Sequence, residues 1–194
     1  MIEVEKKFLI DQSILKKITK EAKFISQKKL VDIYYDTSDF KLTTKDWWLR
    51  NRNGKFELKV AVLGSKSSID QYHEIDEEKG ICQHLKITFK NSLSETLKQN
   101  NINPFAKIVS ERKKYKKDNF IIDFDITDFG YSICEVEIMV ENEFQIKQAL
   151  ERIEKFKTKN DLSPEPVRGK LVEYIYRHNP QHYQALQAAG VIRD

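Results

Sequence analysis

The chain has 194 residues, a length typical of one domain, and we expect a single domain over 1–194. Its net charge of +4 excludes a strongly basic nucleic-acid coat but permits a small polyanionic ligand. No apolar run reaches the ~20 residues of a membrane span, the N-terminus matches no signal or transit peptide, and the two cysteines form neither a disulfide framework nor a metal motif. These features predict a cytoplasmic protein with no membrane or nucleic-acid partner.

In chain order, the first half of the sequence reads mainly as strands. Alternation and β-branched or aromatic residues predict them at 2–10, 23–36, 47–52, 55–62 and 69–75. A short helix is expected over about 13–22. Asn53-Gly54 lies between the third and fourth of these strands and is the strongest local signal for a β-hairpin. A loop at 63–68 precedes the fifth strand.

Helical spacing appears in the second half. The stretch 76–101 carries it, with a capping box at 92–95. Amphipathic spacing predicts a longer helix over 143–157, and a terminal helix follows the Asn-Pro pair at 179–180. Further strands are predicted at 106–115, 119–126, 131–140 and 170–176. Short connections join most of these strands, so the sheet should be antiparallel.

Charged residues repeat with period two on several of these strands. Because side chains alternate across a strand, each charged set shares one face and apolar residues take the other. The same-sign pairs are Glu3/Glu5, Asp123/Asp125, Glu135/Glu137 and Arg50/Arg52. A solvated sheet face explains any one of these strands. If the amphipathic helices cover the apolar face, however, the charged face lies inside a curved or closed sheet.

An inward charged face would have chemical consequences. Carboxylates packed together repel one another unless cations lie among them. These charged pairs offer only oxygen ligands, with no His or Cys at ligand spacing, and oxygen ligands suit a hard divalent metal such as Mg²⁺, Mn²⁺ or Ca²⁺. The arginine pair could then hold phosphate oxygens through its planar forks. From the residues alone, a metal–polyphosphate site and a solvated face both remain open.

Several motifs resemble those of the CYTH superfamily, the triphosphate tunnel metalloenzymes. They are E-x-E-x-K at 3–7, YYDT at 34–37, WLR-x-R at 48–52, ELK at 57–59, the run D-x-D-x-x-DFGY…EVE at 123–137, KL-x-x-Y at 170–174 and P-Q-x-Y at 180–183. Within the superfamily, the chain is most similar to the thiamine triphosphatases. The resemblance implies an α+β fold: a closed eight-stranded antiparallel β-barrel with flanking helices, whose charged lumen is the triphosphate tunnel.

The resemblance also implies roles for individual residues. Metal-binding carboxylates are expected at Glu3, Glu5, Asp123, Glu135 and Glu137, with Mg²⁺, or alternatively Mn²⁺, as the metal. Triphosphate ligands are expected at Lys7, Arg50, Arg52, Lys59, Arg112 and Lys170. Trp48 matches the indole that lies against thiamine, and a rim hydrophobe is its alternative role. Catalytic candidates are Glu3, Glu5, Lys59 and Tyr34, while Glu74 and Asp125 match the pattern with less certain roles.

The implied reaction is metal-dependent hydrolysis of thiamine triphosphate to thiamine diphosphate and phosphate. The expected partner is therefore a small-molecule triphosphate, and the chain is expected to act as a monomer. One alternative is an inorganic tripolyphosphatase. Others are a nucleoside triphosphatase or adenylyl cyclase, and a non-enzymatic polyphosphate-binding module, which would need no carboxylate cluster.

Overall fold

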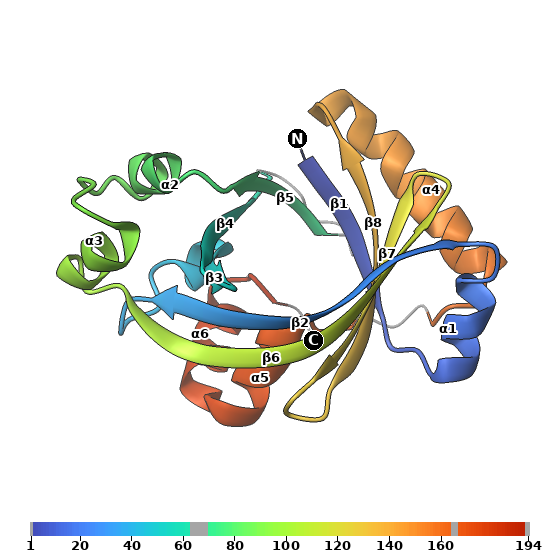
Figure 1. Cartoon of the computed structure of the whole chain (residues 1–194). Coiled ribbons are helices and arrows are strands. Elements are labelled where there is room, and N and C mark those ends of the chain that lie inside the picture. Colours follow the sequence, from blue (N-terminus) through green and yellow to red (C-terminus); the bar gives the residue numbers. More distant parts are fainter. Residues whose placement is uncertain (1, 63–69, 164–166, 193–194) are drawn as a thin grey trace. The chain divides into compact units, whose positions relative to one another are not determined.

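The structure is a computed structural model that describes residues 2–62, 70–163 and 167–192. The loop predicted at 63–68 and the first residue of the strand predicted at 69–75 lie outside these residues. The strands are β1 (Ile2–Phe8), β2 (Lys23–Asp36), β3 (Trp47–Arg52), β4 (Lys55–Ala61), β5 (Asp70–Ile75), β6 (Asn103–Lys117), β7 (Phe120–Thr127) and β8 (Ser132–Val140), labelled in Figure 1.

The strands form one antiparallel sheet that closes into a ring. Their order is β1-β5-β4-β3-β2-β6-β7-β8, and β8 pairs back to β1 with Glu5 opposite Glu137. The predicted hairpin joins β3 to β4, and its Asn53 and Gly54 both have positive φ, at 50° and 92°. A tight turn of this kind has the right-handed twist of the strands that it connects. The predicted eight-stranded antiparallel fold is therefore confirmed.

Six helices occur among the described residues. They are α1 (Gln12–Ile18), α2 (Glu78–Leu85), α3 (Leu93–Gln99), α4 (Ile146–Lys159), α5 (Lys170–His178) and α6 (Pro180–Ala188), with 3₁₀ turns η1 (Thr43–Lys45) and η2 (Glu143–Gln145). Side chains cap three of them: Asp11 at α1, Ser92 at α3 and Asn179 at α6 each accept a backbone N–H. Within the residues that the structure covers, no helix has the length and hydropathy of a membrane span.

The prediction of a strand at 170–176 is wrong, because these residues form α5. Leu171 and Ile175 are buried one helical turn apart, and Arg177 donates to Glu173 at 2.8 Å across the same spacing. The Leu-Val and Tyr-Ile-Tyr content of this segment is typical of a strand, and this misled the prediction. Local propensity is a weak guide where tertiary packing selects the element.

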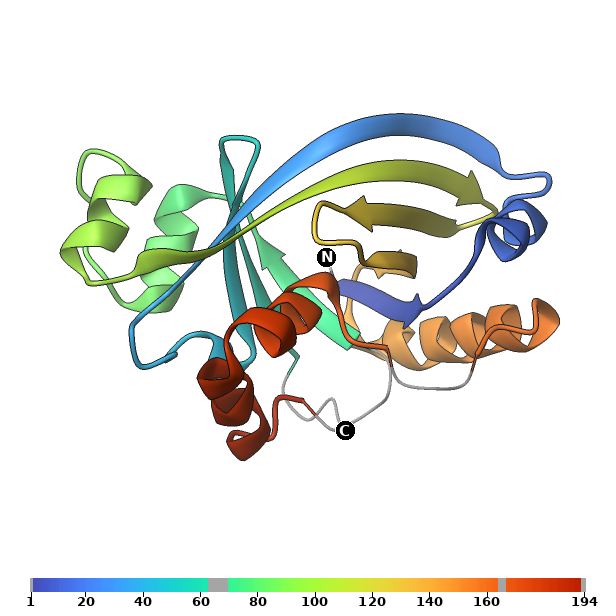
Figure 2. The same ribbon diagram turned by 90° about the horizontal axis from the view of Figure 1, so that it is seen from below.

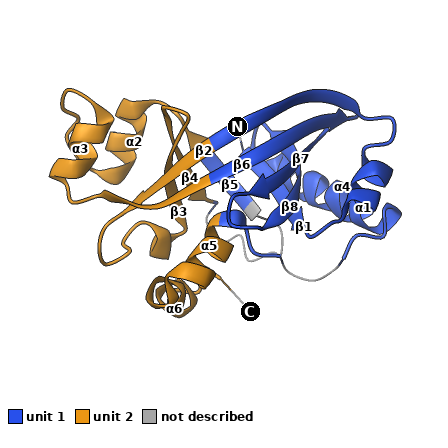
Figure 3. Ribbon diagram, turned by 60° about the horizontal axis from the view of Figure 1, so that its bottom comes forward, with its two compact units in different colours: residues 1–30, 62–73, 109–170 blue, residues 31–61, 74–108, 171–194 orange. Residues whose placement is uncertain are grey.

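The chain divides into two compact units, coloured separately in Figure 3. Unit 1 comprises Met1–Leu30, Val62–His73 and Val109–Lys170, and unit 2 comprises Val31–Ala61, Glu74–Ile108 and Leu171–Asp194. In unit 1, α4 packs on β1 and β8, and Figure 2 shows it lying along β1. Apolar residues of α1 and α4 cover Val4, Phe8, Ile122, Phe124, Val136 and Ile138.

The charged face of the unit 1 strands is buried as well. Glu3 is 6% exposed, Glu5 4% and Asp123 1%, although their apolar neighbours on the same strands already pack against α1 and α4. Both faces of β1, and both faces of β7 around Asp123, are therefore shielded from water. The solvated-face alternative is wrong for these strands, and their ionic groups must find partners inside the protein.

Unit 2 has a core of its own. Leu49 of β3 and Phe56 and Leu58 of β4 pack with residues of α2 and α3. The stretch predicted to be helical at 76–101 thus supplies two short helices that cover this sheet face. By strand alternation, Arg50 and Arg52 project from the other face.

Candidate active site

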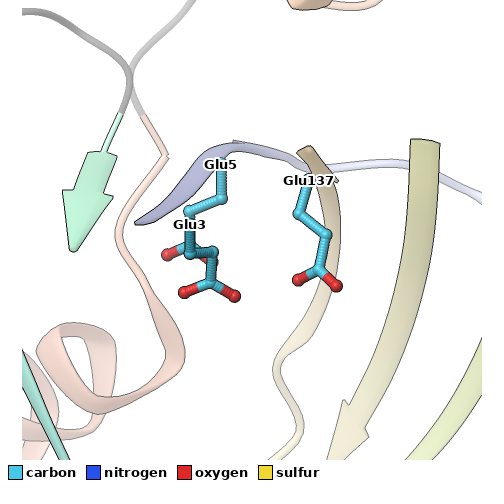
Figure 4. A group of neighbouring side chains, drawn as sticks. All are labelled: Glu3, Glu5 and Glu137. Atoms are coloured by element: carbon cyan, nitrogen blue, oxygen red, sulfur yellow. The ribbon is translucent and has the colours of Figure 1, made fainter. Parts of the chain in front are cut away.

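Three carboxylates of unit 1 form a tight buried cluster. Glu3 and Glu5 come from β1 and Glu137 from β8, and one oxygen of each lies within 4.8 Å of the others. Strand pairing explains the arrangement, since Glu5 is directly opposite Glu137 and Glu3 is two residues along the same face. Figure 4 shows the three side chains with their carboxylates gathered on one side of the strands.

This proximity changes the acidity of the cluster. Burial, together with the charge of Glu3 and a hydrogen bond shared with it, raises the pKa of Glu137 to about 9. A carboxyl with this pKa is protonated at neutral pH unless a cation joins it. In the metal-free protein, Glu137 therefore holds a proton where a metal ion would neutralise the cluster.

Asp123 adds a further buried oxygen to the same face of the unit. Its Oδ2 accepts from Arg112 and, at 3.1 Å, from Lys114, whereas its Oδ1 has no hydrogen-bond partner within the part of the chain that the structure describes. Burial raises the pKa of Asp123. Oxygen donors alone, buried and partly unsatisfied, suit a hard divalent cation, so the residues present fit the metal that the sequence predicts.

Arg112 lies among the carboxylates of β7 and β8. Its Nε and Nη2 donate to the two oxygens of Asp125 at 2.6 Å each, and Nη2 also donates to Glu135 at 2.9 Å. Although burial alone would raise it, the hydrogen bonds and charge of Arg112 and the charge of Lys170 hold the pKa of Asp125 below its usual value. Asp125, whose role the sequence left uncertain, is thus the anchor of two predicted phosphate ligands.

The remaining predicted cations of unit 1 also contact carboxylates. Lys7 donates to Glu5 at 2.6 Å, and Lys170, the first residue of α5, donates to Asp125 at 2.6 Å. A side chain at Gly169 would crowd Lys7, because a Cβ at this position would lie 3.1 Å from Cε of Lys7. The glycine leaves room for the lysine stem beside the cluster.

Lys114 is a site residue that the sequence analysis missed. Its Nζ lies 3.1 Å from Asp123 and 3.6 Å from Glu137, so it contacts carboxylates on two strands. The signal was present, since Lys114 is two residues from Arg112 and shares its face of β6. The many neighbouring lysines obscured it.

Unit 2 contains the basic residues of β3 and β4 that were predicted to bind triphosphate. Arg50 makes two bonds to one oxygen of Glu57, at 2.8 and 2.6 Å, and Arg52 bonds both oxygens of buried Asp32, at 2.6 and 2.8 Å. Neither carboxylate was predicted as a site residue. Each carboxylate fixes the plane of the guanidinium group that it accepts from.

Tyr34 and Lys59, the predicted catalytic residues of unit 2, each lie beside a charged side chain. Tyr34 lies opposite Arg50 and accepts a hydrogen bond from it, while Lys59 lies 3.5 Å from Glu74. Burial, followed by the charge of Asp32, raises the pKa of Tyr34, so its hydroxyl stays protonated at neutral pH.

Trp48 lies on β3 opposite Lys59 and is half-buried. Its indole Nε1 donates to Oδ1 of Asp46 at 2.6 Å. The structure therefore groups the predicted residues in two sets. Unit 1 holds the carboxylates with Lys7, Arg112 and Lys170, and unit 2 holds Tyr34, Trp48, Arg50, Arg52 and Lys59.

The strands of unit 1 bury carboxylates and cations on the face opposite their apolar core, which defines a protein with a buried ionic site. The CYTH domain model matches residues 1–166, and the chain belongs to the CYTH domain family. It is 29% identical to the thiamine-triphosphatase of Homo sapiens, with 100% of this chain and 93% of that protein covered. The thiamine-triphosphatase of Macaca fascicularis is also 29% identical, over 96% of this chain and 89% of that protein.

Solved structures share the fold. A protein of Pyrococcus horikoshii OT3 superposes with a TM-score of 0.69 at 22% identity, covering 91% of this chain and 99% of its own. A Hippeastrum protein, described as a candidate adenylyl cyclase with a dominant triphosphatase activity, has a TM-score of 0.53 at 16% identity, covering 91% of this chain and 94% of its own. At these identities the likeness concerns the fold alone.

Proposed function

We propose that this chain is a metal-dependent hydrolase of small triphosphates, and that thiamine triphosphate is its organic substrate. The observation that carries the proposal is the buried cluster of Glu3, Glu5 and Glu137, whose oxygens lie within 4.8 Å of one another. A cluster of this kind has a high electrostatic free energy unless a cation or a proton joins it. Membership of the CYTH family and the named relatives support the same reaction.

Glu3, Glu5 and Glu137, with Asp123 and Glu135, are the residues that would hold the metal. A bound Mg²⁺ or Mn²⁺ would neutralise phosphate charge and lower the pKa of a water molecule. Lys114, which contacts Asp123 and Glu137, would keep these carboxylates in place and balance their charge before the metal enters. No side-chain nucleophile is required, because phosphoryl transfer to water depends mainly on positioning and charge neutralisation.

The predicted phosphate ligands are Lys7, Arg112 and Lys170 of unit 1 and Arg50, Arg52 and Lys59 of unit 2. The cations of unit 1 bond carboxylates, and a triphosphate would compete with those anions for them. The guanidinium planes of Arg50 and Arg52 are already oriented by Glu57 and Asp32. Preorientation of this kind lowers the entropy cost of binding a phosphate group.

Tyr34 and Lys59 are proposed to assist the attack of water. A tyrosine that stays protonated can orient a water molecule by hydrogen bonding, and a lysine can stabilise the charge that develops on the leaving oxygen. Trp48 is the proposed contact for the thiamine ring, because an indole face attracts a flat cation.

A panel of substrates tests the proposal directly. Phosphate release would be measured with Mg²⁺ on thiamine triphosphate, inorganic tripolyphosphate and ATP, at equal concentrations. We expect thiamine triphosphate to have the highest kcat/KM. Preference for tripolyphosphate would retain the triphosphatase assignment and remove the thiamine one, whereas inactivity on all three substrates would contradict the proposed function.

Removal of the predicted arginines should weaken the binding of every triphosphate. We expect Arg50→Ala to raise KM by about tenfold or more, since a charge-assisted bond to phosphate is lost. Arg52→Ala alone would remove the guanidinium that bonds both oxygens of the buried carboxylate of Asp32, so the double variant Arg52→Ala/Asp32→Asn is the better test. The exposed Lys55→Ala on β4 serves as the control. An increase in KM confined to thiamine triphosphate would contradict phosphate contact.

Substitution of Trp48 should lower the hydrolysis of the organic substrate selectively. Loss of a partly desolvated cation–π contact predicts that Trp48→Ala lowers kcat/KM for thiamine triphosphate by about 10- to 30-fold. Tripolyphosphate has no ring, so its hydrolysis should change by less than about twofold. Equal losses on the two substrates, measured side by side, would show instead that Trp48 supports the rim of the sheet.

A further inference from the structure

The indole of Trp48 is held by a charged acceptor, Asp46, which immediately precedes strand β3. Its Nε1 donates to Oδ1 of Asp46 at 2.6 Å, a length typical of a strong, charge-assisted hydrogen bond. A half-buried ring at a strand terminus could otherwise adopt several rotamers. The bond to Asp46 selects one orientation of the ring, and therefore determines which face the ring presents.

The backbone of Asp46 is fixed at the same time. The residue has left-handed geometry, with φ 60° and ψ 39°, at the end of η1. Its N–H donates to the carbonyl of Thr43 at 3.0 Å, and its carbonyl accepts from Ala61 at 3.2 Å. Left-handed geometry is uncommon for residues other than glycine, and asparagine and aspartate adopt it most readily. Asp46 therefore both ends the turn and directs a carboxylate toward the indole.

The turn η1 is itself anchored by a buried polar network. The hydroxyl of Thr43 donates to Asp36 at 2.7 Å and lies 2.7 Å from Nε2 of His182 on α6. Because that hydroxyl proton is given to Asp36, the ring of His182 must be the donor to Thr43. His182 is fully buried and stacks on Phe40 with the ring centroids 4.0 Å apart. The position of Asp46 is thus determined from three segments of unit 2.

We propose that Asp46 is a positioning residue: it holds the Trp48 indole ready to stack on a flat aromatic cation and so favours triphosphates that carry such a ring. The inference rests on the proposed function of Trp48 as the ring contact. It adds a second determinant of specificity that lies outside the phosphate-binding and metal-binding residues. Asp46 acts through the tryptophan and does not contact the substrate.

Three substitutions separate the orientation of the Trp48 indole from changes in the backbone of the turn. Asp46→Gly retains the left-handed backbone and removes the acceptor, while Asp46→Asn retains both backbone preference and an acceptor oxygen. Asp118→Gly is the matched control, because Asp118 is an exposed aspartate with φ 54° in the turn between β6 and β7 of unit 1. We expect Asp46→Gly to lower kcat/KM for thiamine triphosphate about fivefold or more, mainly through KM, and Asp46→Asn to stay within about twofold.

Tripolyphosphate is the reference substrate, and fluorescence gives a readout that does not depend on activity. In a Trp47→Phe background, the emission of Trp48 should shift in Asp46→Gly and be restored in Asp46→Asn. The inference would be overturned if Asp46→Gly lowered kcat/KM equally for both substrates. It would also be overturned if Asp46→Asn lowered kcat/KM for thiamine triphosphate as much as Asp46→Gly does. If the parent protein did not hydrolyse thiamine triphosphate, the proposed function would fail, and an unshifted emission would overturn the positioning role separately.

Discussion

Glu137→Gln is expected to lower kcat for any triphosphate by about 10³-fold, and Glu5→Gln by a similar factor. The two residues are paired across β1 and β8, and each contributes an oxygen to the buried carboxylate cluster. Glutamine has nearly the same shape but supplies one neutral oxygen, so affinity for a hard cation should fall steeply. The measurement is phosphate release at saturating substrate, over a series of Mg²⁺ concentrations.

The stability of the metal-free variant gives a second readout with a defined sign. Burial raises the pKa of Glu137 to about 9 from an ordinary 4.5, so the folded protein binds this proton more tightly than the unfolded chain. The stability contributed by the protonation of Glu137 is fully present below the pKa of this residue in the unfolded chain. It is lost as the pH rises toward the pKa of Glu137 in the folded protein. Metal-free Glu137→Gln should therefore have a higher Tm than the parent at about pH 8, and a similar Tm at about pH 4.

The control for these variants is Glu111→Gln, the same substitution at an exposed glutamate of β6. It should change neither kcat nor the pH dependence of Tm. If Glu137→Gln lowered the Tm of the metal-free protein while the folded fraction retained normal turnover, the cluster would be structural. That pair of results would contradict the metal assignment and leave the fold unaffected.

The strand pattern was largely predictable because it is local. β2 and β3 occupy the predicted residues, and the Asn53-Gly54 hairpin joins β3 to β4 as its sequence indicates. The acidic pairs of β1 and β8 were visible as charges repeating with period two. Closure of the ring was not visible in this way, because pairing of β1 with β8 joins segments more than a hundred residues apart, and only the family resemblance supplied it.

The partners of the charged residues were less predictable than their positions. The sequence shows which face carries Arg112 but not which strand lies opposite, so its bonds to Asp125 and Glu135 depend on a register that only the fold determines. The same holds for Arg52 and Asp32 on β3 and β2. The α5 prediction failed for the opposite reason, since there a strong local pattern was overridden by packing.

Metal removal is expected to abolish activity and to destabilise the protein. Excess EDTA should reduce phosphate release below about one-hundredth of the initial rate, because no cation then remains at the carboxylates to neutralise phosphate charge or to lower the pKa of a water molecule. Mg²⁺ or Mn²⁺ should restore the rate, and Ca²⁺ should restore it poorly because its coordination is looser. Full turnover in EDTA would contradict the proposal.

The increase in stability that the metal produces should become larger as the pH rises from neutral toward the pKa of Glu137. Binding must displace the proton of Glu137, whose pKa burial raises to about 9, so metal affinity should increase between neutral pH and that value. A ligand present at 100 times its Kd stabilises the folded state by about 2.7 kcal/mol, which is enough to shift Tm by several degrees. The increase in Tm caused by Mg²⁺ should therefore be larger at about pH 8.5 than at about pH 6.5, and Glu137→Gln should remove this difference. A metal-induced shift that is independent of pH in the parent protein would place the cation away from Glu137.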